Sequence, residues 1–243
     1  MNNDLLSVVA QNAMFVLTFL GIVIAVFLIA YLCEKLGKNT KTDSAASNER
    51  ILSTKKIVVI GMFSAISTVL MILDFPVPFA PPFYKFDFSE LPALIAGFAY
   101  GPVAGVMVEF VKIVLKVLLK GTSTAFVGEL ANFVIGCGLI LPAAIIYRLN
   151  KTKKTALIAC ITGTVLITLI GSLFNAFYLL PAFAKLYGMP MEAIVGMGTK
   201  VNPNITSVNS LVILAVAPLN LLKGVINSII TMLVYKHISH LIK

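Results

Sequence analysis

Residues 75–90 read FPVPFAPPFYKFDFSE, and they separate two strongly apolar segments. Four prolines and six aromatic residues share these sixteen positions. Because proline fixes φ and removes a backbone donor, the stretch predicts a loop that holds its shape without a hydrogen-bond ladder. Its aromatic side chains are suited to stacking on a flat ring or closing over it. An aromatic belt at the membrane interface is the alternative interpretation.

The composition around this loop is that of an integral membrane protein. Hydrophobic residues make up 59% of the 243 positions, charged residues make up 12%, and the mean hydropathy is +0.99. Several apolar windows approach the ~20 residues that cross a bilayer. The cysteines show no metal-ligand spacing, and no GxxxxGK[ST] or HExxH motif occurs. We therefore predict that the protein is not an enzyme and holds no metal or cofactor.

The apolar segments predict an all-α protein in three parts. We expect an extra N-terminal transmembrane helix within 1–34, a cytoplasmic polar linker over 35–56 and a six-helix membrane domain over 57–243. Ser89 is expected to cap one helix. No β pattern is visible. The expected helices are 14–33, 57–73, 89–100, 102–120, 125–149, 155–181 and 208–236, and 182–207 is expected to be a long connection and a candidate second part of a lid.

The lysines and arginines predict the orientation in the membrane. With the N-terminus outside and the C-terminus in the cytoplasm, twelve of these residues fall in inner segments and four in outer loops. Basic residues favour the cytoplasmic side, so the proline-rich loop is expected outside. The positive charge is then expected to face lipid headgroups and not nucleic acid.

Three lysines lie inside predicted helices, where an unpaired charge is costly. Lys112 and Lys116 share a helical face with Glu109, so a structural ion pair or snorkelling to the outer surface explains them. Lys223 shares a face with Asn220 and has no carboxylate on its own helix. Its acceptor must come from elsewhere, and we interpret it as part of a ligand-facing stripe, with a structural polar seam as the alternative.

Other segments offer polar groups at a similar depth, in the pairs Glu129 with Asn132 and Asn175 with Tyr178. Such a lining suits an uncharged, heteroatom-rich, partly aromatic ligand. The predicted ligand-binding residues are Phe83, Tyr84, Lys85, Phe86, Asp87, Glu129, Asn132, Asn175, Tyr178, Asn220 and Lys223, and Glu90 is a further carboxylate at this level.

The stretch IGMFSAIST (60–68) carries Gly61 and Ala65 at small-xxx-small spacing, with Ser64 and Thr68 beside them. Such faces let helices approach closely, although many of these pairs are incidental. We predict that these residues form a partner-docking face.

In these motifs the chain resembles the substrate-binding S component of energy-coupling-factor (ECF) vitamin transporters, specifically the riboflavin-binding members. The resemblance covers roughly 55–240. The motifs that carry it are FPVPFAPPFYKFDFSELPALIAGFAYGPVAG, GTSTAFVGELANF, SLFNAFYLLP and APLNLLKG. Two departures are the extra helix at 14–33 and Gly61, which stands where the family usually has alanine.

The resemblance implies a six-helix bundle in a prokaryotic cell membrane that takes up riboflavin, its transported ligand, from the outer side. It also implies docking to a coupling membrane protein driven by two ATPase subunits. Asn175, Asn220 and Lys223 would contact the isoalloxazine or ribityl group, and the aromatic loop would close the site. The alternatives are an S component for another vitamin, such as folate or thiamine, and a membrane scaffold that transports nothing.

Overall fold

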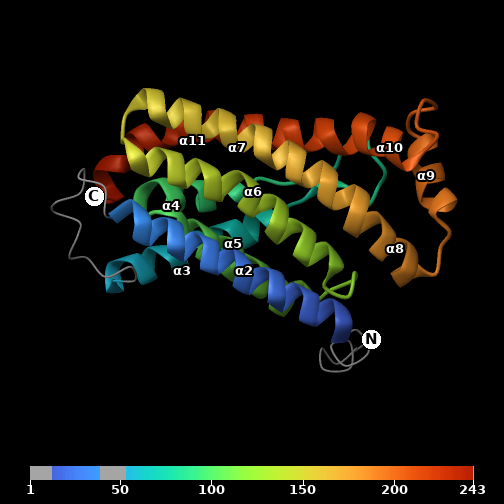
Figure 1. Ribbon diagram of the computed structural model, residues 1–243, viewed down its shortest axis with the longest axis horizontal. Coiled ribbons are helices and arrows are strands. Elements are labelled where there is room, and N and C mark those ends of the chain that lie inside the picture. Colours follow the sequence, from blue (N-terminus) through green and yellow to red (C-terminus); the bar gives the residue numbers. More distant parts are fainter. Residues whose placement is uncertain (1–12, 39–52, 243) are drawn as a thin grey trace.

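The computed structural model describes residues 13–38 and 53–242, and within that part of the chain nearly every residue of regular structure is helical. The long helices lie side by side as one bundle (Figure 1). Its elements are α2 (Ala13–Lys38), α3 (Thr54–Ile72), β1 (Phe75–Pro76), β2 (Lys85–Phe86), α4 (Glu90–Tyr100), α5 (Pro102–Lys120), α6 (Val127–Leu149), α7 (Lys153–Phe174), the π-helical turn η1 (Asn175–Leu179), α8 (Leu180–Tyr187), α9 (Met191–Thr199), α10 (Val208–Leu211), the π-helical turn η2 (Val212–Val216) and α11 (Ala217–Ile242).

Five stretches are long and apolar enough to span a membrane: Ala13–Leu36, Thr54–Ile72, Val127–Leu149, Lys153–Tyr187 and Val208–Val234. The predicted all-α membrane architecture is therefore confirmed. Helix α5 has a comparable length but carries four charged residues, and α4 is shorter. Most of the expected linker, residues 39–52, lies outside the described residues.

The chain also contains two strands and two short helices that the sequence did not predict. Strands β1 and β2 pair antiparallel, with Phe75 opposite Phe86, so the proline-rich loop is closed at its base as a hairpin. Two residues a strand are too few to show an alternating pattern. The expected long connection at 182–207 is largely helical, because α8 and α9 occupy most of it.

The Ser89 cap was also predicted wrongly. Its side chain makes no capping hydrogen bond to α4. The Ser89 hydroxyl instead accepts a hydrogen bond from Lys112 Nζ at 2.9 Å, and its backbone N–H donates to Asp87 Oδ1 at 2.8 Å. Ser89 has helical backbone angles (φ −69°, ψ −19°) and not the extended angles from which a capping side chain reaches the first turn.

Two π-helical turns interrupt the helices expected at 155–181 and 208–236, each just before a proline. The N–H of Leu180 donates to the carbonyl of Asn175, and the N–H of Ala217 donates to that of Val212, which is one residue more than α-helical spacing. Pro181 and Pro218 follow directly. A proline ring clashes with the carbonyl four residues earlier, and the wider turn relieves that clash. Both turns lie beside the cavity described below.

Close packing of α6 against α7 depends on Gly163. A Cβ at this position would lie 2.7 Å from the carbonyl oxygen of Leu139 and 3.0 Å from its Cδ1. Backbone atoms cannot rotate away, so only glycine permits this approach. Gly61, on the outer face of α3, has nothing within 4 Å of such a Cβ.

We therefore expect Gly163→Ala to lower the thermal unfolding temperature of detergent-purified protein, since overpacking costs about 1–3 kcal/mol. Gly61→Ala is the matched control and should leave that temperature equal or slightly higher, because alanine is the better helix former. Equal unfolding temperatures for the two variants would contradict the packing described here.

Candidate ligand-binding site

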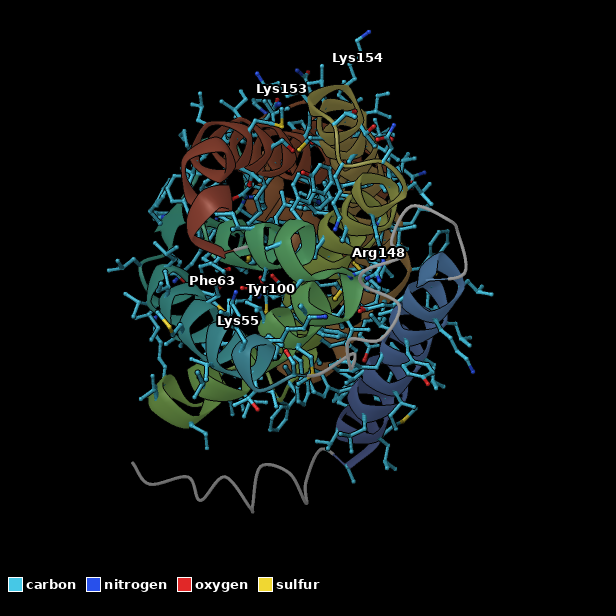
Figure 2. The ribbon with its side chains drawn as sticks, turned by 90° about the vertical axis from the view of Figure 1, so that its left-hand side faces the viewer. Lys55, Phe63, Tyr100, Arg148, Lys153 and Lys154 are labelled. Carbon is cyan, nitrogen blue, oxygen red and sulfur yellow. The ribbon has the colours of Figure 1, made fainter. Side chains whose placement is uncertain are left out.

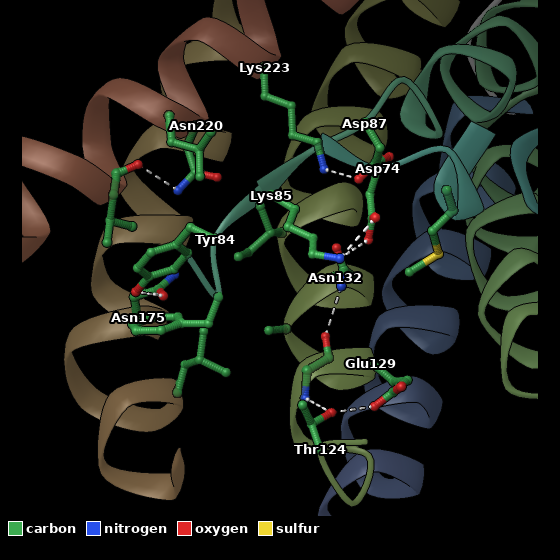
Figure 3. A pocket seen from close by; sticks show the side chains of 18 of the residues that line it. Asp74, Tyr84, Lys85, Asp87, Thr124, Glu129, Asn132, Asn175, Asn220 and Lys223 are labelled. Carbon is green, nitrogen blue, oxygen red and sulfur yellow. Dashed lines mark hydrogen bonds and ion pairs between the residues drawn. The ribbon is translucent and has the colours of Figure 1, made fainter. Parts of the chain in front are cut away.

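A cavity of about 240 Å³ lies between the hairpin loop, α5, α6, η1 and α11 (Figure 3). Its wall combines polar and apolar side chains. The polar lining residues are Asp74, Tyr84, Lys85, Asp87, Lys116, Lys120, Ser123, Thr124, Glu129, Asn132, Asn175, Asn220 and Lys223, and the larger apolar ones are Met71, Phe83, Ile135, Leu179, Phe183, Val216 and Leu219.

One wall joins the hairpin loop to the helical bundle through Tyr84. Its hydroxyl donates to Asn175 Oδ1 at 2.7 Å, and Asn175 Nδ2 donates to the carbonyl of Gly171 at 2.7 Å. Burial raises the pKa of the Tyr84 phenol, so this group stays protonated and acts as a donor. The neighbouring Asn220 fits because Gly171 has no side chain: a Cβ there would lie 2.5 Å from Asn220 Nδ2.

The rim of the cavity is formed by α5, α6 and the turn between them. Glu129 is 2% exposed and forms an ion pair with Lys116. Its other carboxylate oxygen accepts hydrogen bonds from Thr122 at 3.0 Å and Thr124 at 2.8 Å. Every oxygen of this buried carboxylate is therefore used, which fixes the side chain.

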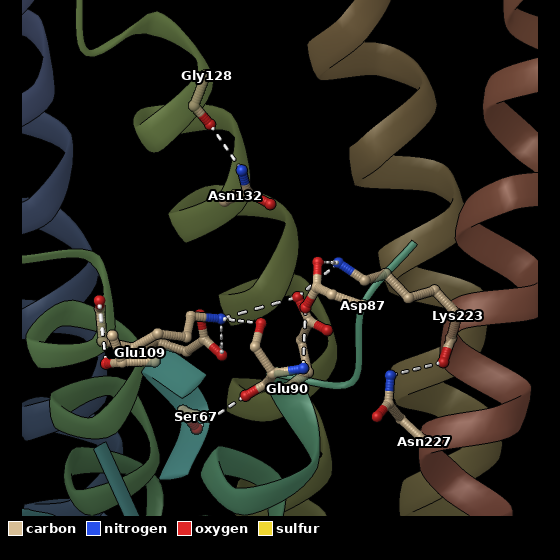
Figure 4. A network of polar contacts seen from close by, with 11 residues as sticks. Ser67, Asp87, Glu90, Glu109, Gly128, Asn132, Lys223 and Asn227 are labelled. Atoms are coloured by element: carbon tan, nitrogen blue, oxygen red, sulfur yellow. Dashed lines mark hydrogen bonds and ion pairs between the residues drawn. The ribbon is translucent and has the colours of Figure 1, made fainter. Parts of the chain in front are cut away.

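The floor of the cavity is a buried charge network (Figure 4). Lys223 Nζ lies 3.2 Å from Asp87 Oδ2 and 2.8 Å from Glu90 Oε1, so the acceptors expected from other segments are present. Glu90 also lies 3.8 Å from Lys112, which is 2.7 Å from Glu109. The network thus joins the loop, α4, α5 and α11.

The two lysines in the interior of α5, Lys112 and Lys116, behave differently. Lys112 is fully buried, pairs with Glu109 and does not line the cavity, as the structural interpretation predicted. Lys116 lines the cavity and pairs with Glu129 on α6. The sequence predicted a structural ion pair or snorkelling to the outer surface for both lysines, so Lys116 was not predicted as a lining residue.

Most of the predicted ligand-binding residues meet at this cavity: Phe83, Tyr84, Lys85, Asp87, Glu129, Asn132, Asn175, Asn220 and Lys223. Phe86 and Tyr178 do not line it. Phe86 is 2% exposed and packs against Phe75 and Phe88, and Tyr178 packs against Phe174. Successive side chains of a strand point to opposite sides, so Phe86 points away from the cavity that Lys85 lines. The π-helical turn η1 shifts the helical register, so Tyr178 does not share the cavity-facing side of Asn175.

Thr124, Lys120 and Phe183 also line the cavity and are not among the predicted ligand-binding residues. Thr124 belongs to the motif GTSTAFVGELANF, which also contains Glu129 and Asn132, so the sequence did carry a signal for it. Among the residues that the structure describes, no group of three or more His, Cys, Asp or Glu side chains could hold a metal ion. The arrangement offers hydrogen-bond donors, acceptors and aromatic faces for binding.

The profile of the ECF transporter substrate-specific component matches residues 55–235. The chain belongs to this family. It is therefore an S component, a transporter subunit and not an enzyme, and its fold is the S-component fold of a multi-pass membrane protein. Its partners include the ECF module.

Individual relatives agree with this assignment. The riboflavin transporter FmnP of Bacillus subtilis (strain 168) is 33% identical over 185 residues, which is 76% of this chain and 92% of that protein. The riboflavin transporter RibU of Staphylococcus aureus (strain TCH60) is 33% identical over 189 residues, covering 78% and 93%. A solved structure, described as "Structure and mechanism of the S component of a bacterial ECF transporter", has a TM-score of 0.61 and 35% identity, covering 78% of this S component and 98% of that chain.

The predicted docking residues of the S component do not share one surface. Gly61 and Ala65 are exposed on the outer face of α3. Ser64 and Thr68 are buried, and their hydroxyls donate to the carbonyls of Ile60 and Ser64 at 2.7 Å. Ser64 and Thr68 lie four residues apart on the side of α3 that packs on α5, where the Thr68 hydroxyl is also 3.4 Å from the carbonyl oxygen of Lys112.

We expect Lys223→Met to lower the thermal unfolding temperature strongly, since removing one partner of a buried ion pair costs about 3–5 kcal/mol. Lys85→Met is the matched control: the Lys85–Asp74 pair is solvent-accessible, and such pairs contribute about 0–1 kcal/mol. A similar unfolding temperature for both variants would show that the Lys223 network does not stabilise the fold.

Proposed function

We propose that this S component binds riboflavin from the outer side of the membrane for ATP-driven uptake by an ECF transporter. The observation that carries the proposal is the cavity beneath the aromatic hairpin loop, where amide, phenol and ammonium groups from Asn175, Asn220, Tyr84 and Lys223 converge. Flat heteroaromatic ligands are recognised by such a combination of aromatic faces and a few directed polar groups. The names of the relatives from B. subtilis and S. aureus support riboflavin over folate or thiamine.

Binding requires movement of the hairpin loop. At about 240 Å³ the cavity is smaller than the ~300–1,000 Å³ typical of ligand sites. Tyr84 and Phe83 occupy part of the space between the walls, and a single side-chain hydrogen bond links Tyr84 to η1. The tip of the loop around Phe83 and Tyr84 therefore withdraws to admit the ligand and closes over it afterwards, while Asp87 at the base of the loop stays paired with Lys223.

The proposed topology places this cavity outside the cell. Lys55, Arg148, Lys153 and Lys154 lie at one end of the bundle (Figure 2), and the positive-inside rule makes that end cytoplasmic. Helix α6 runs from the cavity rim at Glu129 to Arg148, so the cavity lies towards the opposite end. The N-terminus is then outside and the C-terminus inside.

The proposed architecture is a six-helix core with one added helix. The core comprises α3, α4, α5, α6, α7 with its continuation α8, and α10 with its continuation α11, and it begins at Thr54, three residues before the expected boundary at 57. Helix α2 (Ala13–Lys38) is the addition, and it ends four residues beyond the expected boundary at 34. The ends of the expected linker 35–56 are therefore helical, and residues 39–52 of that linker, which lie outside the described residues, are proposed to be cytoplasmic. The energising partners are a coupling membrane protein and two ATPase subunits, and the exposed face of α3 around Gly61 and Ala65 is the proposed docking surface.

The ligand is tested by titrating detergent-purified protein with riboflavin and following the quenching of flavin fluorescence. Wild-type protein should show saturable one-to-one quenching. Asn220→Ala should weaken binding about tenfold or more, because the loss of a polar partner in a buried site costs about 1–3 kcal/mol. Asn209→Ala, an exposed asparagine on α10 outside the cavity, is the matched control and should bind like wild type.

Absence of quenching by folded wild-type protein would overturn riboflavin as the ligand, and saturable binding of folate or thiamine would then identify another vitamin. Equal affinity of Asn220→Ala and Asn209→Ala would overturn this cavity as the site. Failure to bind any of the three vitamins would mean that this S component takes a different substrate.

The docking surface is tested by Gly61→Leu, which adds bulk to a face with open space. We expect normal riboflavin binding and loss of co-purification with the ECF module, because small residues permit the close approach of a partner helix. Gly21→Leu on α2 is the matched control, since Gly21 is also exposed with nothing within 4 Å. Normal co-purification of Gly61→Leu would place the docking surface elsewhere.

A further inference from the structure

Helix α2 lies outside the part of the chain that the family profile matches, which begins at residue 55. The solved S component aligns over 98% of its own length while covering 78% of this chain. The family core therefore leaves α2 without a role. The contacts of α2 with α5 and α6 nevertheless include a buried charge and an aromatic cluster, which a simple lipid anchor does not need.

The inner end of α2 is held by Glu34, which is fully buried. One carboxylate oxygen lies 3.2 Å from Arg148 in the last turn of α6. The other accepts a hydrogen bond from the N–H of Val103 at 3.1 Å. Val103 lies in the first turn of α5, where N–H groups lack helical partners and the helix dipole favours a negative charge. One side chain thus joins three helices.

The turn before α5 is shaped to fit this contact. Gly101 has a φ of +100°, which other residues rarely adopt. A Cβ on Gly101 would lie 2.5 Å from the Arg148 guanidinium and 3.2 Å from a Glu34 carboxylate oxygen. The Gly101–Pro102 turn therefore leaves room for the ion pair between α2 and α6.

The outer half of α2 contacts the turn that borders the cavity. Phe19 is 8% exposed, and its ring centre lies 6.4 Å from those of Phe126 and Phe133. Phe126 directly precedes α6 and has a φ of +69°, a conformation that costs a residue other than glycine about 1–3 kcal/mol. Such a conformation persists only where neighbouring groups hold it, and Phe19 is one of these groups.

The same turn positions the cavity rim. The backbone N–H of Phe126 donates to the Thr122 hydroxyl at 3.2 Å, and that hydroxyl donates to Glu129 at 3.0 Å. Thr124 donates to the same carboxylate, and both Thr124 and Glu129 line the cavity. A series of direct contacts therefore runs from Phe19 through Phe126 and Thr122 to Glu129.

We propose that α2 is a positioning element of the ligand site. Glu34 fixes its inner end to α5 and α6, and Phe19 holds the 121–126 turn so that Thr124 and Glu129 keep their places on the cavity rim. The proposal rests on the proposed function for its ligand, and it assigns a role to residues outside the family core. The opposite face of α2, which includes the exposed Leu17 and Ile24, faces lipid.

The test compares Phe19→Ala with Leu17→Ala in the full chain. Leu17 is 69% exposed on the same helix, so its truncation is the matched control. Two quantities are measured well below the unfolding temperature of each variant: hydrogen exchange of the 121–130 amides without ligand, and the riboflavin dissociation constant. Phe19→Ala should speed exchange in 121–126 and weaken binding about tenfold, which is about 1.4 kcal/mol. Leu17→Ala should change neither quantity.

The two measurements separate the two proposals. If wild-type protein fails to bind riboflavin, the assigned ligand is wrong, and faster exchange in Phe19→Ala would still support α2 as the element that holds the turn. Faster exchange with unchanged riboflavin affinity would overturn the role of α2 in the ligand site. Unchanged exchange would overturn the proposal altogether.

Glu34→Gln examines the inner contact separately. The amide oxygen can still accept the Val103 hydrogen bond, but the ion pair with Arg148 is lost. We expect faster exchange in 121–126, as in Phe19→Ala, because α2 is released at its inner end. Lys35→Gln, at an exposed neighbouring position, is the control for charge loss and should leave exchange unchanged. Identical exchange in Glu34→Gln and Lys35→Gln would show that the ion pair does not position the turn.

Discussion

The ammonium of Lys223 lies inside a protein that is itself surrounded by lipid, so it must be matched by negative charge from within the fold. Asp87 and Glu90 supply that charge from the hairpin loop and α4, more than 130 positions away in the sequence. Glu90 lies between Lys223 and Lys112, and Lys112 binds Glu109. Because each of these groups would be costly alone, the network fixes the relative positions of four segments and forms the cavity floor.

The cavity walls depend on a second constraint, which is the effect of proline on helices. Pro181 and Pro218 each follow a π-helical turn, and these two turns, η1 and η2, contact one another beside the cavity. The wider turn changes which side chains face inward, so Asn175 and Val216 line the cavity while Tyr178 does not. The prolines of the hairpin loop act differently, by stiffening a segment that is tied to the bundle through Tyr84.

The family assignment covers the core of the molecule, and helix α2 lies outside that core. The family core accounts for the cavity, the hairpin loop and the exposed face of α3. Helix α2 packs on α5 and α6, whereas α3 packs on α4 and α5. The Gly61 face of α3 is therefore left open by α2, and an added helix is compatible with docking to the ECF module.

The sequence by itself determined the membrane class, most helix positions and the residue types of the site, because bilayer length, apolar runs and proline are local properties. It also indicated that Lys223 needs a distant acceptor. Only the tertiary structure decided which acceptors those are, that Lys116 pairs with Glu129 and not with Glu109, and that Ser64 and Thr68 face the core. Ion pairs between helices depend on how the helices pack, and the register shift at η1 depends on local backbone geometry. Neither is encoded in the spacing of residues along one helix.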